Sequence, residues 1–231
     1  MSVRVAMILA AGRGTRLRPL TDRTPKPLLQ VAGRPLIEHH LDRLAALGIE
    51  RVVINLHHLG DRIRAALGDG SRWGMTLAYS EEAELLETAG GLRAALALLG
   101  PDPFLVLNGD VFCDYDPTPL LRGPEGADCH LVMVPTPPWR EAGDFDIADP
   151  EPASGERRPL IDGAGRRFVY SGIGIYEPRM FASLPIAPLP LRPLFDSGIR
   201  AGRITGELHR GSWDDIGTRE RLDAARVRFG D

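Results

Sequence analysis

The sequence predicts an α/β fold in which helices cover both faces of a mostly parallel sheet, with an insertion at one edge. Short apolar runs alternate with amphipathic stretches of helical spacing through the first half of the chain, which is the pattern of βαβ units. A loop rich in glycine and arginine directly follows the first apolar run, where α/β folds bind ligands. The length of 231 residues suits one domain, 1–231, with a sizeable core.

The first half contains a regular series of elements. Residues 3–10 (VRVAMILA) are predicted to form a buried strand, since nearly all of them are apolar. Residues 35–48 carry apolar side chains at helical spacing, with Pro35 at the start and Gly48 at the stop. The elements expected next are strand 51–56, helix 59–70, strand 75–80, helix 90–100 and strand 103–110, which ends in polar residues.

After Asp110 the alternation becomes less regular. The stretch 135–166 is rich in proline, glycine and charge, and we expect it to be an excursion at the edge of the sheet, such as a hairpin or a lid. The other elements expected in this half are strands 127–134, 167–178 and 203–211 and helices 189–202 and 218–229.

Composition excludes several classes of protein. The chain has 28 basic and 31 acidic residues, so no basic excess indicates a nucleic-acid partner. Its two cysteines, Cys113 and Cys129, have no metal-like spacing and are typical of free thiols in a reducing cytosol. No segment reaches the roughly 18 apolar residues that a membrane span needs. We therefore expect a cytoplasmic protein without a membrane partner.

The stretch LAAGRGTRLRPLTDRTPKPLL, residues 9–29, has the features of a triphosphate-binding loop. It is not a P-loop, because the chain lacks Gly-Lys-Ser/Thr, and Leu17 stands where a dinucleotide fingerprint needs its third glycine. Small residues let backbone N–H groups approach a ligand, and arginines add positive charge. Prolines on both sides of one lysine restrict its backbone. The residues concerned are Ala10, Ala11, Gly12, Gly14, Arg13, Arg16, Arg18 and Lys26.

This stretch resembles the signature of the sugar-1-phosphate nucleotidyltransferases. The matching residues are Leu9, Ala10, Gly12, Gly14, Thr15, Arg16, Leu17, Pro19, Leu20, Thr21, Pro25, Lys26 and Pro27. The order of the later elements also fits, so the resemblance covers nearly the whole chain. It implies a Rossmann-like nucleotide-diphospho-sugar transferase fold with a nucleotide-binding half, 1–110, and a sugar-binding half, 111–231.

The resemblance also implies a magnesium ion held by two aspartates. Asp110 ends the apolar strand FLVLNGD, and Asp215 precedes Ile-Gly-Thr in WDDIGT, where the family has its second metal ligand. Asp214 is the rival for that second position. With Arg16 on the β- and γ-phosphates and Lys26 between the α-phosphate and the sugar phosphate, the expected catalytic residues are Arg16, Lys26, Asp110 and Asp215.

The remaining site residues are assigned by the same resemblance. Gly90 or Gly91, in ETAGGL, would line the nucleoside site, and Asn108 would face both substrates. The full nucleotide-binding set is Leu9, Ala10, Ala11, Gly12, Arg13, Gly14, Thr15, Lys26, Gly90, Gly91 and Asn108. The sugar-phosphate set is Asn108, Asp144, Ser171 and Gly172.

Within the family the chain is most similar to the compact N-acetylmuramate-1-phosphate uridylyltransferases of cell-wall recycling. The shared stretches are ETAGG, NGDVFCDYD, GDFDI, SGIGIY and GELHRGSWDDIGT. The implied reaction joins UTP and N-acetylmuramate α-1-phosphate into a UDP-sugar and pyrophosphate, in a monomer or small homo-oligomer. The alternatives are a mannose- or heptose-1-phosphate guanylyltransferase and a glucose-1-phosphate uridylyl- or thymidylyltransferase. A more remote alternative is a non-catalytic domain that senses nucleotide sugars.

Overall fold

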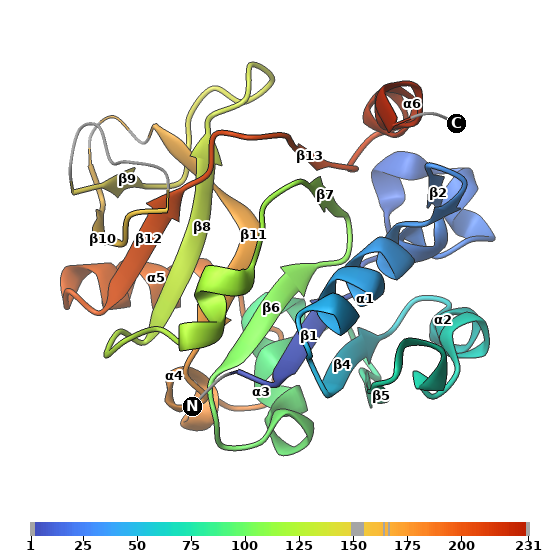
Figure 1. Cartoon of the computed structure of the whole chain (residues 1–231), viewed down its shortest axis with the longest axis horizontal. Coiled ribbons are helices and arrows are strands. Elements are labelled where there is room, and N and C mark those ends of the chain that lie inside the picture. Colours follow the sequence, from blue (N-terminus) through green and yellow to red (C-terminus); the bar gives the residue numbers. More distant parts are fainter. Residues whose placement is uncertain (1–2, 149–154, 164, 166, 230–231) are drawn as a thin grey trace.

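The computed structural model describes residues 3–148, 155–163, 165 and 167–229. A nine-stranded sheet runs through the molecule in the order β5-β4-β1-β6-β11-β8-β12-β10-β9 (Figure 1). Its strands are β1 (Val5–Leu9), β4 (Arg51–Leu56), β5 (Thr76–Glu81), β6 (Phe104–Asn108), β8 (Cys129–Pro135), β9 (Asp146–Ile147), β10 (Arg158–Ile161), β11 (Phe168–Tyr176) and β12 (Ile204–Leu208). Each strand predicted from the sequence is therefore present, with bounds that differ by at most three residues at either end.

The first four strands of this order, β5, β4, β1 and β6, are all parallel. Beyond them β11 is antiparallel to both β6 and β8, so the second half of the sheet is mixed. The predicted α/β fold is confirmed. The less regular alternation after Asp110 corresponds to these antiparallel pairings, which need no crossover helix.

Helices cover both faces of the sheet. Adjacent residues of a strand face opposite ways, and apolar residues on both faces of the central strands form two cores. Ile8 of β1 packs in one core with Ile37, Leu41 and Ile63, whereas its neighbour Met7 packs in the other. The helices are α1 (Leu36–Ala46), α2 (Gly60–Leu67), α3 (Glu87–Leu99), α4 (Arg179–Ala182), α5 (Arg192–Arg200) and α6 (Arg219–Phe229). In the part of the chain that the structure describes, none of them is both long and apolar enough to cross a membrane.

The predicted excursion 135–166 contains an edge hairpin. Strands β9 and β10 pair antiparallel at the end of the nine-stranded sheet, next to β12. Residues 149–154, 164 and 166 of the excursion lie outside the described residues. The expectation of a hairpin at the sheet edge is thus confirmed for the residues that can be described.

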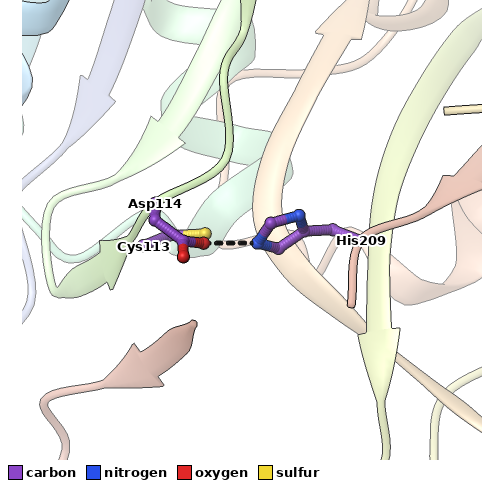
Figure 2. A group of neighbouring side chains, drawn as sticks. All are labelled: Cys113, Asp114 and His209. Carbon is purple, nitrogen blue, oxygen red and sulfur yellow. Dashed lines mark hydrogen bonds and ion pairs between the residues drawn. The ribbon is translucent and has the colours of Figure 1, made fainter. Parts of the chain in front are cut away.

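Two short pairs of strands were not predicted. Strands β2 (Gln30–Val31) and β3 (Arg34–Pro35) form a small hairpin after the glycine-rich loop. Strands β7 (Val111–Cys113) and β13 (Trp213–Asp215) form an antiparallel ribbon that joins the chain after β6 to the chain after β12. Beside this ribbon His209 contacts Asp114, which follows β7 directly (Figure 2).

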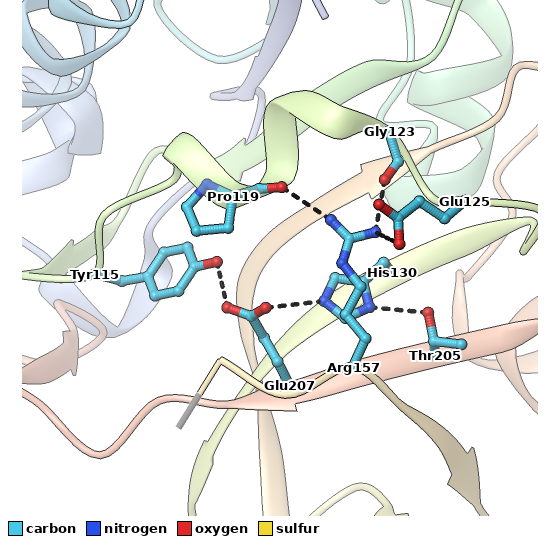
Figure 3. Close-up of polar contacts among 8 residues, drawn as sticks. All are labelled: Tyr115, Pro119, Gly123, Glu125, His130, Arg157, Thr205 and Glu207. Atoms are coloured by element: carbon cyan, nitrogen blue, oxygen red, sulfur yellow. Dashed lines mark hydrogen bonds and ion pairs between the residues drawn. The ribbon is translucent and has the colours of Figure 1, made fainter. Parts of the chain in front are cut away.

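A buried polar network lies on β8 and β12. Glu207, 1% exposed, accepts hydrogen bonds from the Tyr115 hydroxyl and from Nε2 of His130 at 3.3 Å (Figure 3). The other ring nitrogen of His130 lies 2.8 Å from the Thr205 hydroxyl. Burial alone would raise the pKa of Glu207, but His130 and Tyr115 outweigh it and lower that pKa. The network therefore satisfies a buried carboxylate.

Candidate active site

The glycine-rich loop leaves β1 at the carboxyl end of the parallel strands. The Ala10 N–H donates to Oδ1 of Asn55 at 2.7 Å, which fixes the loop to β4. Gly14 has φ 60°, and a Cβ there would lie 2.8 Å from the Thr21 methyl group. Among the described residues no atom lies within 4 Å of a Cβ placed on Gly12. Gly14 is thus needed for the backbone conformation of the loop, whereas Gly12 leaves the space above the loop open.

A cavity of about 600 Å³ opens over this loop. Its walls come from the loop, from the ends of β4, β5 and β6, from the start of α3 and from residues 190–192 at the start of α5. A cavity of this size suits a ligand as large as a nucleotide. The predicted site residues that line it are Leu9, Ala10, Ala11, Gly12, Gly14, Thr15, Arg16, Lys26, Asn108 and Asp110.

Arg13, Gly90 and Gly91 do not belong to this lining. Arg13 is exposed, and its Nη2 lies 3.4 Å from Nε2 of His57. A Cβ on Gly90 would lie 2.1 Å from the Ala187 carbonyl oxygen, and one on Gly91 would lie 2.8 Å from Glu82. The two glycines thus allow close packing of α3, and their predicted contact with the nucleoside stays a prediction.

Asn55 and Glu82 form a buried polar pair in the lining of the cavity that was not predicted from the sequence. Glu82 is 6% exposed, and its carboxylate accepts from Nδ2 of Asn55 at 2.7 Å and from the Leu86 N–H at 3.0 Å. The pair therefore joins the glycine-rich loop, β4 and the start of α3. A polar residue near the end of each of two apolar strands was the signal that could have indicated it.

Lys26 and Asp110 form an ion pair inside the cavity. Lys26 begins a short 3-10 turn between Pro25 and Pro27, and its Nζ contacts Oδ2 of Asp110 just beyond β6. The side chain of Lys26 is 13% exposed and that of Asp110 is 30% exposed. The lysine thus points into the cavity, as the flanking prolines indicated.

Asp215 is brought to Asp110 by the β7–β13 ribbon. Asp215 pairs with Val111, the residue after Asp110, and the Ile216 N–H donates to the Asp110 carbonyl oxygen at 2.8 Å. The carboxylate of Asp215 accepts from Nη1 of Arg221. Asp110 is thus paired with Lys26, and Asp215 is paired with Arg221. Two carboxylates supply the kind of oxygen ligand that Mg²⁺ prefers.

Asp214 has different surroundings from Asp215. Its Oδ1 is buried with no hydrogen-bond partner among the described residues. Burial and, after it, the charge of Asp215 raise the pKa of Asp214. Since neighbouring strand residues point to opposite faces, Asp214 and Asp215 cannot both face the same site, and the choice of Asp215 as the metal ligand stays a prediction.

Of the predicted sugar-phosphate residues, Gly172 lies beside Asn108. The pairing of β11 with β8 shifts register between Tyr170 and Gly174, and Gly172 in this bulge has φ 84°. A Cβ on Gly172 would lie 2.6 Å from Nδ2 of Asn108. Ser171 is buried, and Oδ2 of Asp144 accepts from the Tyr170 N–H at 2.9 Å. Ser171, Gly172 and Asp144 do not line the first cavity, so their contact with the sugar stays a prediction.

A second cavity of about 640 Å³ contains Asp215. Arg16 lines both cavities and therefore lies at their boundary. A Cβ on Gly217 would lie 3.0 Å from Nη2 of Arg16 and 2.7 Å from Nη2 of Arg221, so this glycine leaves room for two guanidinium groups. The boundary between the cavities is thus suited to anionic groups.

Comparison with known proteins agrees with this geometry. A family model described as nucleotidyl transferase matches residues 5–228. The chain is 47% identical to the N-acetylmuramate alpha-1-phosphate uridylyltransferase of Neisseria meningitidis serogroup B, over 97% of this chain and 98% of the other. It is 35% identical to the protein of that description from Caulobacter vibrioides, over 99% and 98%. A crystal structure of a putative glucose-1-phosphate thymidylyltransferase from Bacillus anthracis superposes with a TM-score of 0.82 at 23% identity, covering 98% and 96%, which shows a shared fold.

Proposed function

Because the chain belongs to the nucleotidyl transferase family, we propose that it transfers UMP from UTP to N-acetylmuramate α-1-phosphate, releasing pyrophosphate. The observation that carries the proposal is the 47% identity with a uridylyltransferase of that substrate over nearly the full length of both chains. The cavity supports it, since it gathers backbone donors, Arg16, Lys26 and Asp110 around a space of nucleotide size.

In the proposed reaction an oxygen of the sugar phosphate attacks the α-phosphorus of UTP. A new P–O bond forms there while the bond to the pyrophosphate oxygen breaks, and pyrophosphate leaves. A phosphate has a second pKa of about 6, so the attacking oxygen is largely ionised at neutral pH and no general base is needed. Catalysis then depends on orientation and on neutralising charge.

The residues of the chain have separate tasks in this scheme. Backbone N–H groups of residues 11–14 and the guanidinium group of Arg16 would hold the outer phosphates. Lys26, whose backbone is restricted by Pro25 and Pro27, would approach the α-phosphate and the sugar phosphate. Asp110 and Asp215 would hold Mg²⁺, which supplies charge neutralisation on both substrates. Residues 1–110 would bind mainly the nucleotide and 111–231 the sugar.

Turnover against a matrix of substrates tests the proposal. UTP, dTTP, GTP, CTP and ATP are each combined with the 1-phosphates of N-acetylmuramate, N-acetylglucosamine, glucose and mannose, and pyrophosphate release is followed. We expect the highest kcat/KM for UTP with N-acetylmuramate α-1-phosphate. Asp110→Asn serves as the control for contaminating activity. A higher kcat/KM for GTP with mannose 1-phosphate would replace the proposal with a guanylyltransferase.

A further inference from the structure

A second group of metal-ligating side chains lies outside the cavities described above. It consists of Cys113, the last residue of β7, Asp114 beside it, and His209, which follows β12 (Figure 2). One ligand atom from each of the three residues lies within 4.8 Å of the other two. Nε2 of His209 is 2.8 Å from Oδ1 of Asp114.

The backbone holds the group from both sides. Cys113 pairs with Trp213 in the ribbon, and the Asp114 N–H donates to the Ser212 carbonyl oxygen at 3.0 Å. The His209 N–H donates to the Met133 carbonyl oxygen at 2.8 Å. Arg43 donates to the Cys113 carbonyl oxygen at 2.5 Å. The donors are therefore positioned before any ligand binds, which lowers the entropic cost of forming a site.

Gly211 leaves space at this position. A Cβ on Gly211 would lie 2.5 Å from Oδ1 of Asp114 and 2.8 Å from Nε2 of His209, so any other residue would press on both donors. The Asp114 side chain is 58% exposed, whereas that of His209 is 13% exposed. The site is thus buried on the thiol side and open to solvent on the carboxylate side.

From this arrangement we propose that Cys113, Asp114 and His209 bind a zinc ion at a site distinct from the magnesium carboxylates. Sulfur, imidazole nitrogen and carboxylate oxygen together select Zn²⁺ over Mg²⁺, which prefers oxygen ligands only. Tetrahedral zinc takes ligands at about 2.0–2.3 Å, so small side-chain rotations close these three donors onto one ion. Solvent supplies the fourth ligand from the exposed side.

Binding at this site exchanges a proton for a metal bond. Burial raises the pKa of the Cys113 thiol to about 11, so the thiol is uncharged in the free protein. As the Zn–S bond forms, the S–H bond breaks and its proton passes to solvent. The bound ion would tie the segment after β6 to the segment after β12, the two segments that carry Asp110 and Asp215.

Cobalt titration of the full chain tests the site directly, because Co²⁺ bound to a thiolate gives a charge-transfer absorption that oxygen-bound Co²⁺ lacks. The titration is done in excess Mg²⁺, which saturates the two aspartates. We expect the thiolate band at one equivalent, its loss when Zn²⁺ is added, and a rise in Tm of several degrees with Zn²⁺.

Two cysteine variants give a matched comparison. Cys113→Ala should lose the thiolate band, whereas Cys129→Ala, which removes the other free buried cysteine, should keep it. His209→Gln should keep the fold, since the glutamine amide is of similar size and can still donate to Asp114, and weaken Co²⁺ binding at least ~10-fold. Absence of the band in the wild-type protein, or equal Co²⁺ affinity in His209→Gln, would overturn the proposal.

Discussion

At the scale of single residues, substitution can separate the roles predicted for Asp110, Asp214 and Asp215. Asp110→Asn and Asp215→Asn preserve shape but remove an anionic ligand, so each should lower kcat by at least ~10²-fold, or about 2.7 kcal/mol of transition-state stabilisation. Asp214→Asn changes a carboxylate whose Oδ1 is buried without a hydrogen-bond partner in the described part of the chain, and it should leave kcat within about threefold. Steady-state kinetics measures kcat for each variant, and circular dichroism checks that each variant is folded. If Asp214→Asn were inactive and Asp215→Asn active, Asp214 would replace Asp215 as the predicted metal ligand.

Lys26 provides a second test at this scale. Its backbone is stiffened by Pro25 and Pro27, and its amine points into the cavity beside Asp110. Lys26→Ala should lose much more activity than stability. Lys26→Arg should also be poor, because a planar guanidinium group cannot replace a compact ammonium group between two phosphates.

The measurement for Lys26 is kcat/KM, determined separately for UTP and for the sugar phosphate. If Lys26→Arg kept more than about half of the wild-type efficiency, a difference below ~0.5 kcal/mol, the phosphate-bridging role of Lys26 would be wrong.

At the scale of secondary-structure elements, the bulge in β11 positions Asn108 through Gly172. Gly172→Ala would strain a residue at φ 84° and press a methyl group on the Asn108 amide, so we expect a loss of about 1–3 kcal/mol in stability and a higher KM for the sugar phosphate. Gly202→Ala is the matched control. Gly202 has φ 66°, and among the described residues nothing lies within 4 Å of its Cβ position.

Chemical unfolding and kinetics on both glycine variants separate backbone strain from the contact with Asn108. Both variants should be destabilised by the strain, but only Gly172→Ala should change KM. Equal KM values in the two variants would remove Asn108 from the sugar-phosphate site.

The elements also show what sequence can and cannot predict. Long apolar strands such as β4 and β6 were evident because burial on both faces makes them apolar along nearly their whole length. Three-residue strands such as β7 and β13 show no period, and they exist because tertiary structure brings them together. The loop motif indicated Lys26, and the polar end of the strand FLVLNGD indicated Asp110. No motif relates Asn55 to Glu82, which are 27 residues apart and meet only in the folded chain.

At the scale of the whole molecule, the network in Figure 3 links stability to pH. Burial lowers the pKa of His130, with Arg157 acting in the same direction and Glu207 and Glu125 opposing. The folded protein therefore keeps His130 neutral, while the unfolded chain takes up a proton near pH 6.5. This contribution to stability is present above pH 6.5 and is lost as the pH falls below it.

His130→Gln should therefore lower Tm at pH 7.5, because a hydrogen bond to Glu207 is disturbed, yet make Tm less dependent on pH between about 6.5 and 5. Thermal unfolding across this range measures the effect, with His58→Gln as the control histidine. An unchanged slope in His130→Gln would assign the acid sensitivity to other groups.

In the free protein the aspartates expected to bind metal are each neutralised by a side chain of the protein itself, Asp110 by Lys26 and Asp215 by Arg221. A metal ion that binds there must displace both cations, and the displaced cations then need new anions. The phosphates of the substrates are such anions. Metal and nucleotide should consequently favour each other's binding, and thermodynamic reciprocity requires each to raise the other's affinity by the same factor.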